Sequence, residues 1–196
     1  MRVHTILAHP LPDSFAAAVH RTAADRLRAC GHEVATADLY AEGFAPALTP
    51  AERAGYFDAE YDSSAVAPLV ERLRWAEALV LVYPHWWFDQ PAILKGYFDR
   101  VWVPGVAFRH DRAGGRILPL LTGLRSVSVL TSFGSPWWLT ELYMRNPARR
   151  ILTKGVLTAC APQARLRYCA LYDMDRATDT ARARHLERVA ALMARL

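Results

Sequence analysis

The chain has 196 residues, of which 53% are hydrophobic and 22% charged, and it carries a formal net charge of +5. This length and composition are typical of one compact globular domain, which we expect to span residues 1–196. No apolar run approaches the about 18 residues of a membrane span, and the arginines are dispersed rather than gathered into one basic stripe. Neither membrane insertion nor nucleic-acid binding is therefore expected.

Three cysteines, Cys30, Cys160 and Cys169, form neither an even disulfide set nor a CxxC pair. This usage favours a reducing compartment and argues against a zinc site. The N-terminal residues lead straight into a strand-like run and lack a signal-peptide layout. We expect a cytoplasmic protein without a metal centre.

Apolar, β-rich runs alternate with helical patterns along the whole chain, which predicts βαβ units around a parallel sheet. The first strand is expected at residues 3–8, and Ser14 stands at the N-cap of a helix that stops at Gly31. The apolar stripe of this helix includes Phe15, Val19, Leu27 and Cys30. A second strand at residues 33–39 precedes helical pieces over residues 51–74.

The second half of the chain continues the alternation. A third strand is expected at residues 78–83, and residues 92–102 read as a well-buried helix. A long connection leads to a fourth strand at residues 126–131, and Asn146 with Pro147 predicts the start of a helix to about Ala159. The last elements are a fifth strand at residues 166–172 and a helix with Ala181, Leu186, Val189 and Met193 facing inward.

Ligands of an open parallel sheet bind beyond the carboxyl ends of its strands, so the loops after the first, third and fourth strands are the candidates. The first of these loops places the Ser14 hydroxyl and several backbone N–H groups at a helix start, which is an anion-binding arrangement. It contains neither GxGxxG nor GxxxxGK(S/T), so a monophosphate or pyrophosphate fits better than a Rossmann or P-loop site. Taken alone, Ser14 is more commonly a plain helix cap, and His9 a residue that hydrogen-bonds locally.

Aromatic residues gather in the other two loops. Trp86, Trp87 and Phe88 are consecutive after the third strand, and Trp137 and Trp138 follow the fourth, so four of the six tryptophans lie in strand-end loops. A flat ring system stacked against these side chains, with loop N–H groups directed at its polar edge, would cover them. For the loop after the third strand, an equal alternative is that the aromatic side chains only cover the end of the sheet or lie in a dimer interface.

Several segments together carry a resemblance to a known family. They are Ala8-His9 with Ser14-Phe15, Asp38-Leu39-Tyr40 with Phe44 and Pro46, residues 84–88, and, most specifically, Pro91-Ala92-Ile93-Leu94-Lys95-Gly96 with Phe98 and Arg100-Val101. The chain resembles the NAD(P)H:quinone oxidoreductase family of flavodoxin-like flavoproteins over nearly its whole length. The resemblance implies an α/β three-layer sandwich, with a five-stranded parallel sheet of order 2-1-3-4-5 and helices on both faces.

The resemblance also implies an NAD(P)H-dependent quinone reductase, in which a flavin passes hydride from NADPH or NADH to a small aromatic acceptor in a ping-pong cycle. FMN is the expected cofactor and FAD the alternative. The implied flavin contacts are His9, Ser14, Phe15 and Ala16 on the phosphate side, Pro84, His85, Trp86, Trp87 and Phe88 along the ribityl chain and ring, and Thr131, Ser132 and Gly134, in a turn with Phe133, at the other polar edge. A homodimer is implied as well, with residues 102–116 as a contributor to the partner's site.

The chain departs from the family pattern after the fourth strand. Thr131-Ser132-Phe133-Gly134 replaces the family's usual Thr-Thr-Gly-Gly turn, and the family's catalytic Tyr and His have no secure counterpart. Tyr143 is a candidate by position only, so the catalytic residue stays unknown. In the long connection, Arg109, His110, Arg112 and Arg116 could meet the 2′-phosphate of NADPH or form a solvated basic loop.

Other functions stay open at this point. A flavodoxin-type electron carrier has the same fold, although a carrier that docks on basic partners would be expected to be acidic. A regulatory ancillary subunit of a membrane transporter is a second alternative, and a serine hydrolase is disfavoured because no GxSxG elbow is present. Quinones, nitroaromatics, azo dyes and free flavin all fit a flat aromatic site.

Overall fold

The computed structural model describes residues 1–58, 61–111 and 115–196. Its strands and α-helices are β1 (Arg2–Leu7), α1 (Phe15–Ala29), β2 (Glu33–Asp38), α2 (Pro50–Ala54), α3 (Ala67–Trp75), β3 (Ala78–Pro84), α4 (Ala92–Val101), β4 (Phe108–His110), β5 (Ile117–Pro119), β6 (Ser126–Ser132), α5 (Pro147–Arg150), α6 (Thr158–Cys160), β7 (Arg165–Leu171) and α7 (Asp179–Met193). Two π-helical segments, Trp138–Tyr143 and Ile151–Leu157, stand before α5 and between α5 and α6.

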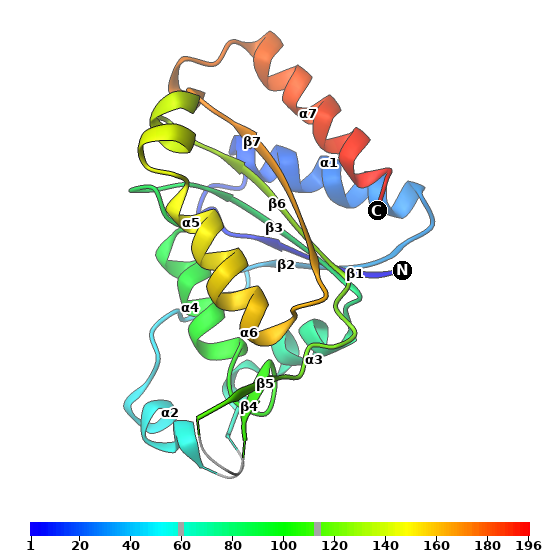
Figure 1. The fold of residues 1–196 in the computed structure, drawn as a ribbon. Helices are drawn as coiled ribbons and strands as arrows, with labels where there is room; N and C mark the ends of the chain where they lie inside the picture. The colour runs from blue at the N-terminus through cyan, green and yellow to red at the C-terminus, as the bar shows by residue number, and fades with distance from the viewer. Residues whose placement is uncertain (59–60, 112–114) are drawn as a thin grey trace.

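The main sheet has five parallel strands in the order β2-β1-β3-β6-β7. Counting only these strands along the chain gives the expected order 2-1-3-4-5, and the labels differ because β4 and β5 form a separate antiparallel hairpin. Figure 1 shows α1 and α7 on one face of the sheet, with α3, α4 and the α5–α6 segment on the other. The predicted three-layer α/β fold is confirmed.

Alternation along β3 divides the core into two halves. Leu79 and Leu81 pack on the α3 and α4 side, whereas Val80 and Val82 pack on the α1 and α7 side. All four are at most 1% exposed, because both faces of a central parallel strand are covered by helices. Such burial fixes the strand register, and the register decides which strand-end loops lie next to each other.

The first helix follows the sequence prediction closely. Ser14 Oγ accepts a hydrogen bond from the Ala17 amide at 3.2 Å, and Gly31 has a φ of +79°, as the predicted cap and stop require. The predicted apolar stripe was wrong at Cys30, which is exposed. Cys30 is the C-cap residue, so the helix has already turned away from the sheet at this position.

The β4–β5 hairpin and the helical segment Trp138–Tyr143 were not predicted. Each hairpin strand has only three residues, which is too short for a clear alternation of apolar and polar side chains. The predicted helix that begins at Asn146 is confirmed: Asn146 Oδ1 accepts from the Arg149 amide at 3.1 Å, and helical backbone continues through α6.

Packing explains two residues of the Pro91 to Val101 segment, Gly96 and Arg100. A Cβ placed on Gly96 would overlap the backbone of Pro46, so α4 can approach that loop closely only with glycine at this position. The Arg100 guanidinium, almost buried, donates to Glu52 Oε1 at 2.6 Å and 2.9 Å and to the carbonyl oxygen of Ala45. These contacts fasten α2 and the loop before it onto α4.

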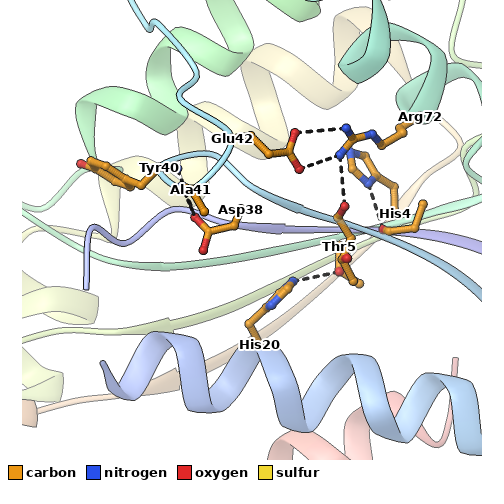
Figure 2. Close-up of polar contacts among 10 residues, drawn as sticks. His4, Thr5, His20, Asp38, Tyr40, Ala41, Glu42 and Arg72 are labelled. Carbon is orange, nitrogen blue, oxygen red and sulfur yellow. Dashed lines mark hydrogen bonds and ion pairs between the residues drawn. The ribbon is translucent and has the colours of Figure 1, made fainter. Parts of the chain in front are cut away.

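Polar groups also hold the β1–β2 edge of the sheet together (Figure 2). Arg72 donates to both oxygens of Glu42, at 2.9 Å and 3.1 Å, and to the Thr36 carbonyl oxygen at 3.1 Å. The fully buried His4 ring lies 3.1 Å from the Ala35 carbonyl oxygen, and burial lowers the pKa of His4 to about 4. These contacts join β1, β2, the loop after β2 and α3 to one another.

Candidate functional site

The three loops selected from the sequence meet at the carboxyl ends of their strands. The His85 amide donates to the Ser132 carbonyl oxygen at 2.8 Å, which joins the loops after β3 and β6. The His9 and Trp86 rings lie 6.1 Å apart, centroid to centroid, which brings the loops after β1 and β3 together. From the boundary between β1 and β3, the chain adds β2 on one side of the sheet and β6 and β7 on the other. This boundary is the topological switch point, where ligands of such sheets bind, and these loops surround it.

The loop after β1 ends in a ready anion site at the start of α1. Ser14 Oγ caps the helix, and the first turn carries no acidic residue. The amides of Phe15 and Ala16 precede the first intrahelical bond, so their N–H groups remain available to a ligand. His9 Nδ1 accepts from the Leu11 amide at 3.1 Å, so His9 does bond locally.

The aromatic residues after β3 form a strained tight turn. The Trp86 amide donates to the Asp89 carbonyl oxygen at 3.0 Å, and the Asp89 amide donates back at 3.1 Å. The central residues Trp87 and Phe88 have φ values of +53° and +61°, a conformation that large side chains rarely adopt outside functional sites. Trp87 is 96% exposed, so the turn presents its aromatic surface to solvent.

A buried hydrogen-bond chain lies beneath the turn. Thr131 Oγ1 donates to the Tyr83 carbonyl oxygen and lies 2.8 Å from His85 Nδ1. Because the threonine hydroxyl has only one proton, His85 Nδ1–H must be the donor to Thr131. Burial lowers the pKa of His85 to about 3, so the ring is neutral with its bare nitrogen at Nε2, which has no hydrogen-bond partner among the described residues.

A fourth loop, after β7, belongs to the same region and was missed by the sequence analysis. The Phe133 ring stacks on His85 at 3.8 Å and on Tyr172 at 5.3 Å. The Met174 amide donates to the Phe133 carbonyl oxygen at 2.9 Å, and the Asp175 carboxylate lies against Gly134. The polar residues Asp173 and Asp175, which follow the last strand, were the signal in the sequence that could have indicated this loop.

The remaining predicted site residues divide by burial. Ala16 and Thr131 are buried, Phe15, Pro84, Phe88 and Ser132 are half-buried, and Gly134 is exposed. Of these residues, Phe15, Ala16, Thr131 and Ser132 line a narrow cavity of about 10 Å³. The candidate site is therefore an open rim of backbone and aromatic groups and not a closed pocket.

Two further predictions concern side chains away from this rim. Tyr143 is 77% exposed and has no hydrogen bond or ring contact with any described residue, so the geometry gives it no catalytic partner. Arg109 and His110 line a cavity of about 650 Å³ beside the β4–β5 hairpin, which lies at the opposite end of the molecule from the strand ends (Figure 1). Arg116 is exposed, and Arg112 lies outside the described residues.

No helix in residues 1–58, 61–111 and 115–196 is long and apolar enough to cross a membrane. The same ranges contain no group of three or more His, Cys, Asp or Glu side chains placed to hold a metal ion.

A parallel sheet of this order with an anion site at its switch point defines the doubly wound α/β class. The family model of the flavodoxin-like fold matches residues 1–193, and the chain belongs to that family. It is 34% identical over 161 residues to the ribosyldihydronicotinamide dehydrogenase-like protein traD of Penicillium crustosum, covering 68% of this chain and 58% of that protein.

Two other similar proteins come from prokaryotes. The chain is 38% identical over 113 residues to the uncharacterized NAD(P)H oxidoreductase YcaK of Escherichia coli, covering 55% of each. It thus spans little more than half the length of these two relatives. Among solved structures, the NAD(P)H:quinone oxidoreductase from Methanothermobacter marburgensis is 28% identical with a TM-score of 0.86, over 99% of this chain and 98% of that one.

Proposed function

We propose that this chain is a flavin-dependent oxidoreductase that passes hydride from NADPH or NADH to a quinone-class acceptor. The observation that carries the proposal is the strained Trp86–Asp89 turn beside the anion site of α1. Strain of this kind costs on the order of 1–3 kcal/mol per residue and persists where a ligand uses the conformation. The name of the Methanothermobacter marburgensis protein gives the same donor and acceptor classes, and the name of the Escherichia coli relative gives the same donor class.

The described residues fit a flavin mononucleotide. The Ser14 hydroxyl and the amides of Phe15 and Ala16 would hold its phosphate. The exposed Trp87 side chain, in the left-handed turn, would lie against its ring system. When bound, the flavin supplies the hydride transfer chemistry. FMN is the cofactor that we propose, and FAD is the alternative that the experiment below includes.

Thr131 and His85 would act as positioning residues. Their side chains are buried and bonded to each other, and their backbone groups line the rim, so they fix the loops after β3 and β6 at one separation. A rim that is held rigid loses little conformational entropy when a flat ligand binds. The exposed Trp86 and Trp87 side chains offer an apolar surface that both the donor and the acceptor could use in turn.

Sharing one surface predicts a ping-pong cycle. Initial-rate plots at several acceptor concentrations should give parallel lines, because the donor leaves before the acceptor enters. Intersecting lines would contradict a shared surface.

We further propose a homodimer. Exposed apolar side chains concentrate between residues 138 and 151, where Trp138, Leu142, Tyr143 and Ile151 are each more than half exposed. The β4–β5 hairpin lies away from the rim of its own chain, so it could complete a rim only in a second copy (Figure 1). Light scattering at working concentration should give twice the chain mass, and a monomer would contradict this proposal.

We also infer one domain over residues 1–196 and a cytoplasmic location. α7, at the end of the chain, packs on α1 through the Phe15 and His185 rings, 5.8 Å apart, which ties both ends to one core. The three cysteines are free, as a reducing compartment requires. Cell fractionation tests the location, and limited proteolysis that releases a folded fragment would contradict the single domain.

The first experiment is an absorbance spectrum after incubation with excess FMN or FAD and desalting. Retained flavin that loses its visible absorption band on addition of NADPH or NADH, and regains it with a simple quinone, would support the proposed activity. Retained flavin without reduction by either nucleotide would favour the electron carrier or the ancillary subunit, and no retained flavin would overturn the proposal.

A further inference from the structure

An open groove of about 530 Å³ lies at the outer edge of the sheet, beside β7. Its walls include Trp137, Glu141, Arg149, Tyr172 and Arg188. In Figure 1 the carboxyl half of β7 passes between the segment that leads into α5 and helix α7, and these two elements supply the two sides of the groove. Apart from Trp137, which belongs to the aromatic residues of the strand-end loops, none of these side chains was assigned a role above.

The groove adjoins the rim of the candidate site. Tyr172 lines the groove, and its ring stacks nearly parallel on Phe133, which in turn stacks on His85. Only the Phe133 ring thus separates the groove from the loop after β3. Trp137 follows shortly after Gly134, so the loop after β6 runs from the rim into the groove. A ligand longer than one ring system could extend from one to the other.

Two guanidinium groups give the groove a positive wall. Arg149 lies over the Tyr168 ring at 5.1 Å, and Arg188 Nη2 donates to the Ala170 carbonyl oxygen at 2.8 Å. Neither arginine forms an ion pair with a carboxylate of the described residues. Both side chains are held in place but keep N–H donors free, which is the arrangement that phosphate oxygens bind.

A carboxylate and an aromatic surface complete the groove. Glu141 Oε1 accepts from the Tyr172 hydroxyl at 2.6 Å and from Asn146 Nδ2 at 2.7 Å, which fixes the carboxylate and leaves Oε2 without a described donor. A fixed carboxylate is a common acceptor for ribose hydroxyls. Trp137 is 53% exposed and offers a face on which a base can stack.

We propose that this groove binds the adenosine diphosphate half of the reduced nicotinamide dinucleotide, with the phosphates on Arg149 and Arg188. Glu141 accepts hydrogen bonds from ribose, and Trp137 stacks with adenine. The inference rests on the proposed function, since the nicotinamide half would then lie at the rim. The adenosine diphosphate half is thereby assigned to the groove beside β7, and not to the basic residues of the β4–β5 hairpin such as Arg109.

The test is titration calorimetry with ADP on the full chain loaded with FMN, so that the anion site of α1 is occupied. ADP should bind, adenosine should bind at least about tenfold more weakly, and NADH should compete with ADP. Arg149→Ala and Arg188→Ala should each weaken ADP binding about tenfold or more. The matched controls are Arg150→Ala and Arg184→Ala, which remove an exposed charge from the same helices outside the groove and should bind as the parent does.

A second pair of variants tests the groove at exposed aromatic side chains. Trp137→Ala should weaken ADP binding, whereas Trp138→Ala, at a neighbouring exposed side chain outside the groove, should not. Undetectable ADP binding, or equal losses in the groove variants and their controls, would overturn the inference. If the chain retains no flavin, the same titration on the flavin-free protein still tests the groove, so the two proposals fail separately.

Discussion

Thr131 Oγ1 lies 2.8 Å from His85 Nδ1 and donates a hydrogen bond to the Tyr83 carbonyl oxygen, so one hydroxyl ties the ends of β3 and β6 together. Tyr83 and Thr131 are register partners in the sheet. The chain of bonds therefore begins one pair before the end of the β3–β6 ladder, whose last register partners are Pro84 and Ser132.

Thr131→Val should destabilise the chain by about 1–3 kcal/mol, because His85 Nδ1–H and the Tyr83 carbonyl oxygen would both lose a buried partner. Urea unfolding at pH 7 measures this change. Ser132→Ala is the control, since Ser132 joins the loops through its backbone carbonyl and keeps that bond. Equal stability of Thr131→Val and the parent would show that the hydroxyl does not tie the loops.

Trp87→Gly should raise the free energy of unfolding by up to about 1 kcal/mol, because glycine adopts the positive φ of this position without steric cost. The same change should lower flavin retention, since the exposed ring is lost. Trp87→Ala separates the two effects: it removes the ring but keeps the strain, so only retention should fall. A less stable Trp87→Gly chain would contradict the role given to the strain.

Gly96→Ala should cost about 1–3 kcal/mol, because the added methyl group overlaps the Pro46 backbone and forces α4 away from that loop. Gly155→Ala is the matched control in a second helical segment, where a Cβ meets no atom within 4 Å. It should leave stability unchanged or raise it slightly. Thermal unfolding of both variants checks the contrast, and similar melting temperatures would contradict the packing argument.

The chain should lose stability in mild acid. Burial lowers the pKa of His4 to about 4, of His185 to about 4 and of His85 to about 3. The unfolded chain therefore takes up protons first as the pH falls from about 6.5, and the stability held by the neutral rings is lost progressively toward pH 4.

His4→Gln tests this pH dependence, because His4 is fully buried. The variant should reduce the loss of unfolding free energy between pH 7 and pH 4 by up to roughly 3 kcal/mol. His110→Gln, at an exposed position on the hairpin, is the control and should keep the full loss. Urea titrations at several pH values supply the free energies, and identical pH profiles for His4→Gln and the parent would rule out this source.

The sequence by itself determined the five sheet strands, the capped first helix and three of the four loops at the strand ends. Apolar periodicity and caps such as Ser14 are local signals, and the strand ends follow from them because parallel strands share one carboxyl edge. The sequence also indicated the aromatic residues at that edge, such as Trp86 and Trp87, because they stand in a loop and not at core positions of a helix or strand.

Only the tertiary structure decided how these residues are bonded. The proton position on His85 depends on Thr131, 46 residues later, and the groove pairs Arg149 with Arg188 from two different helices. Such partners meet only after strand order and register are formed, and no local pattern encodes that meeting. The Gly96–Pro46 contact was invisible for the same reason, because packing across the chain decides it. The hairpin was missed because its three-residue strands are too short to show an alternation.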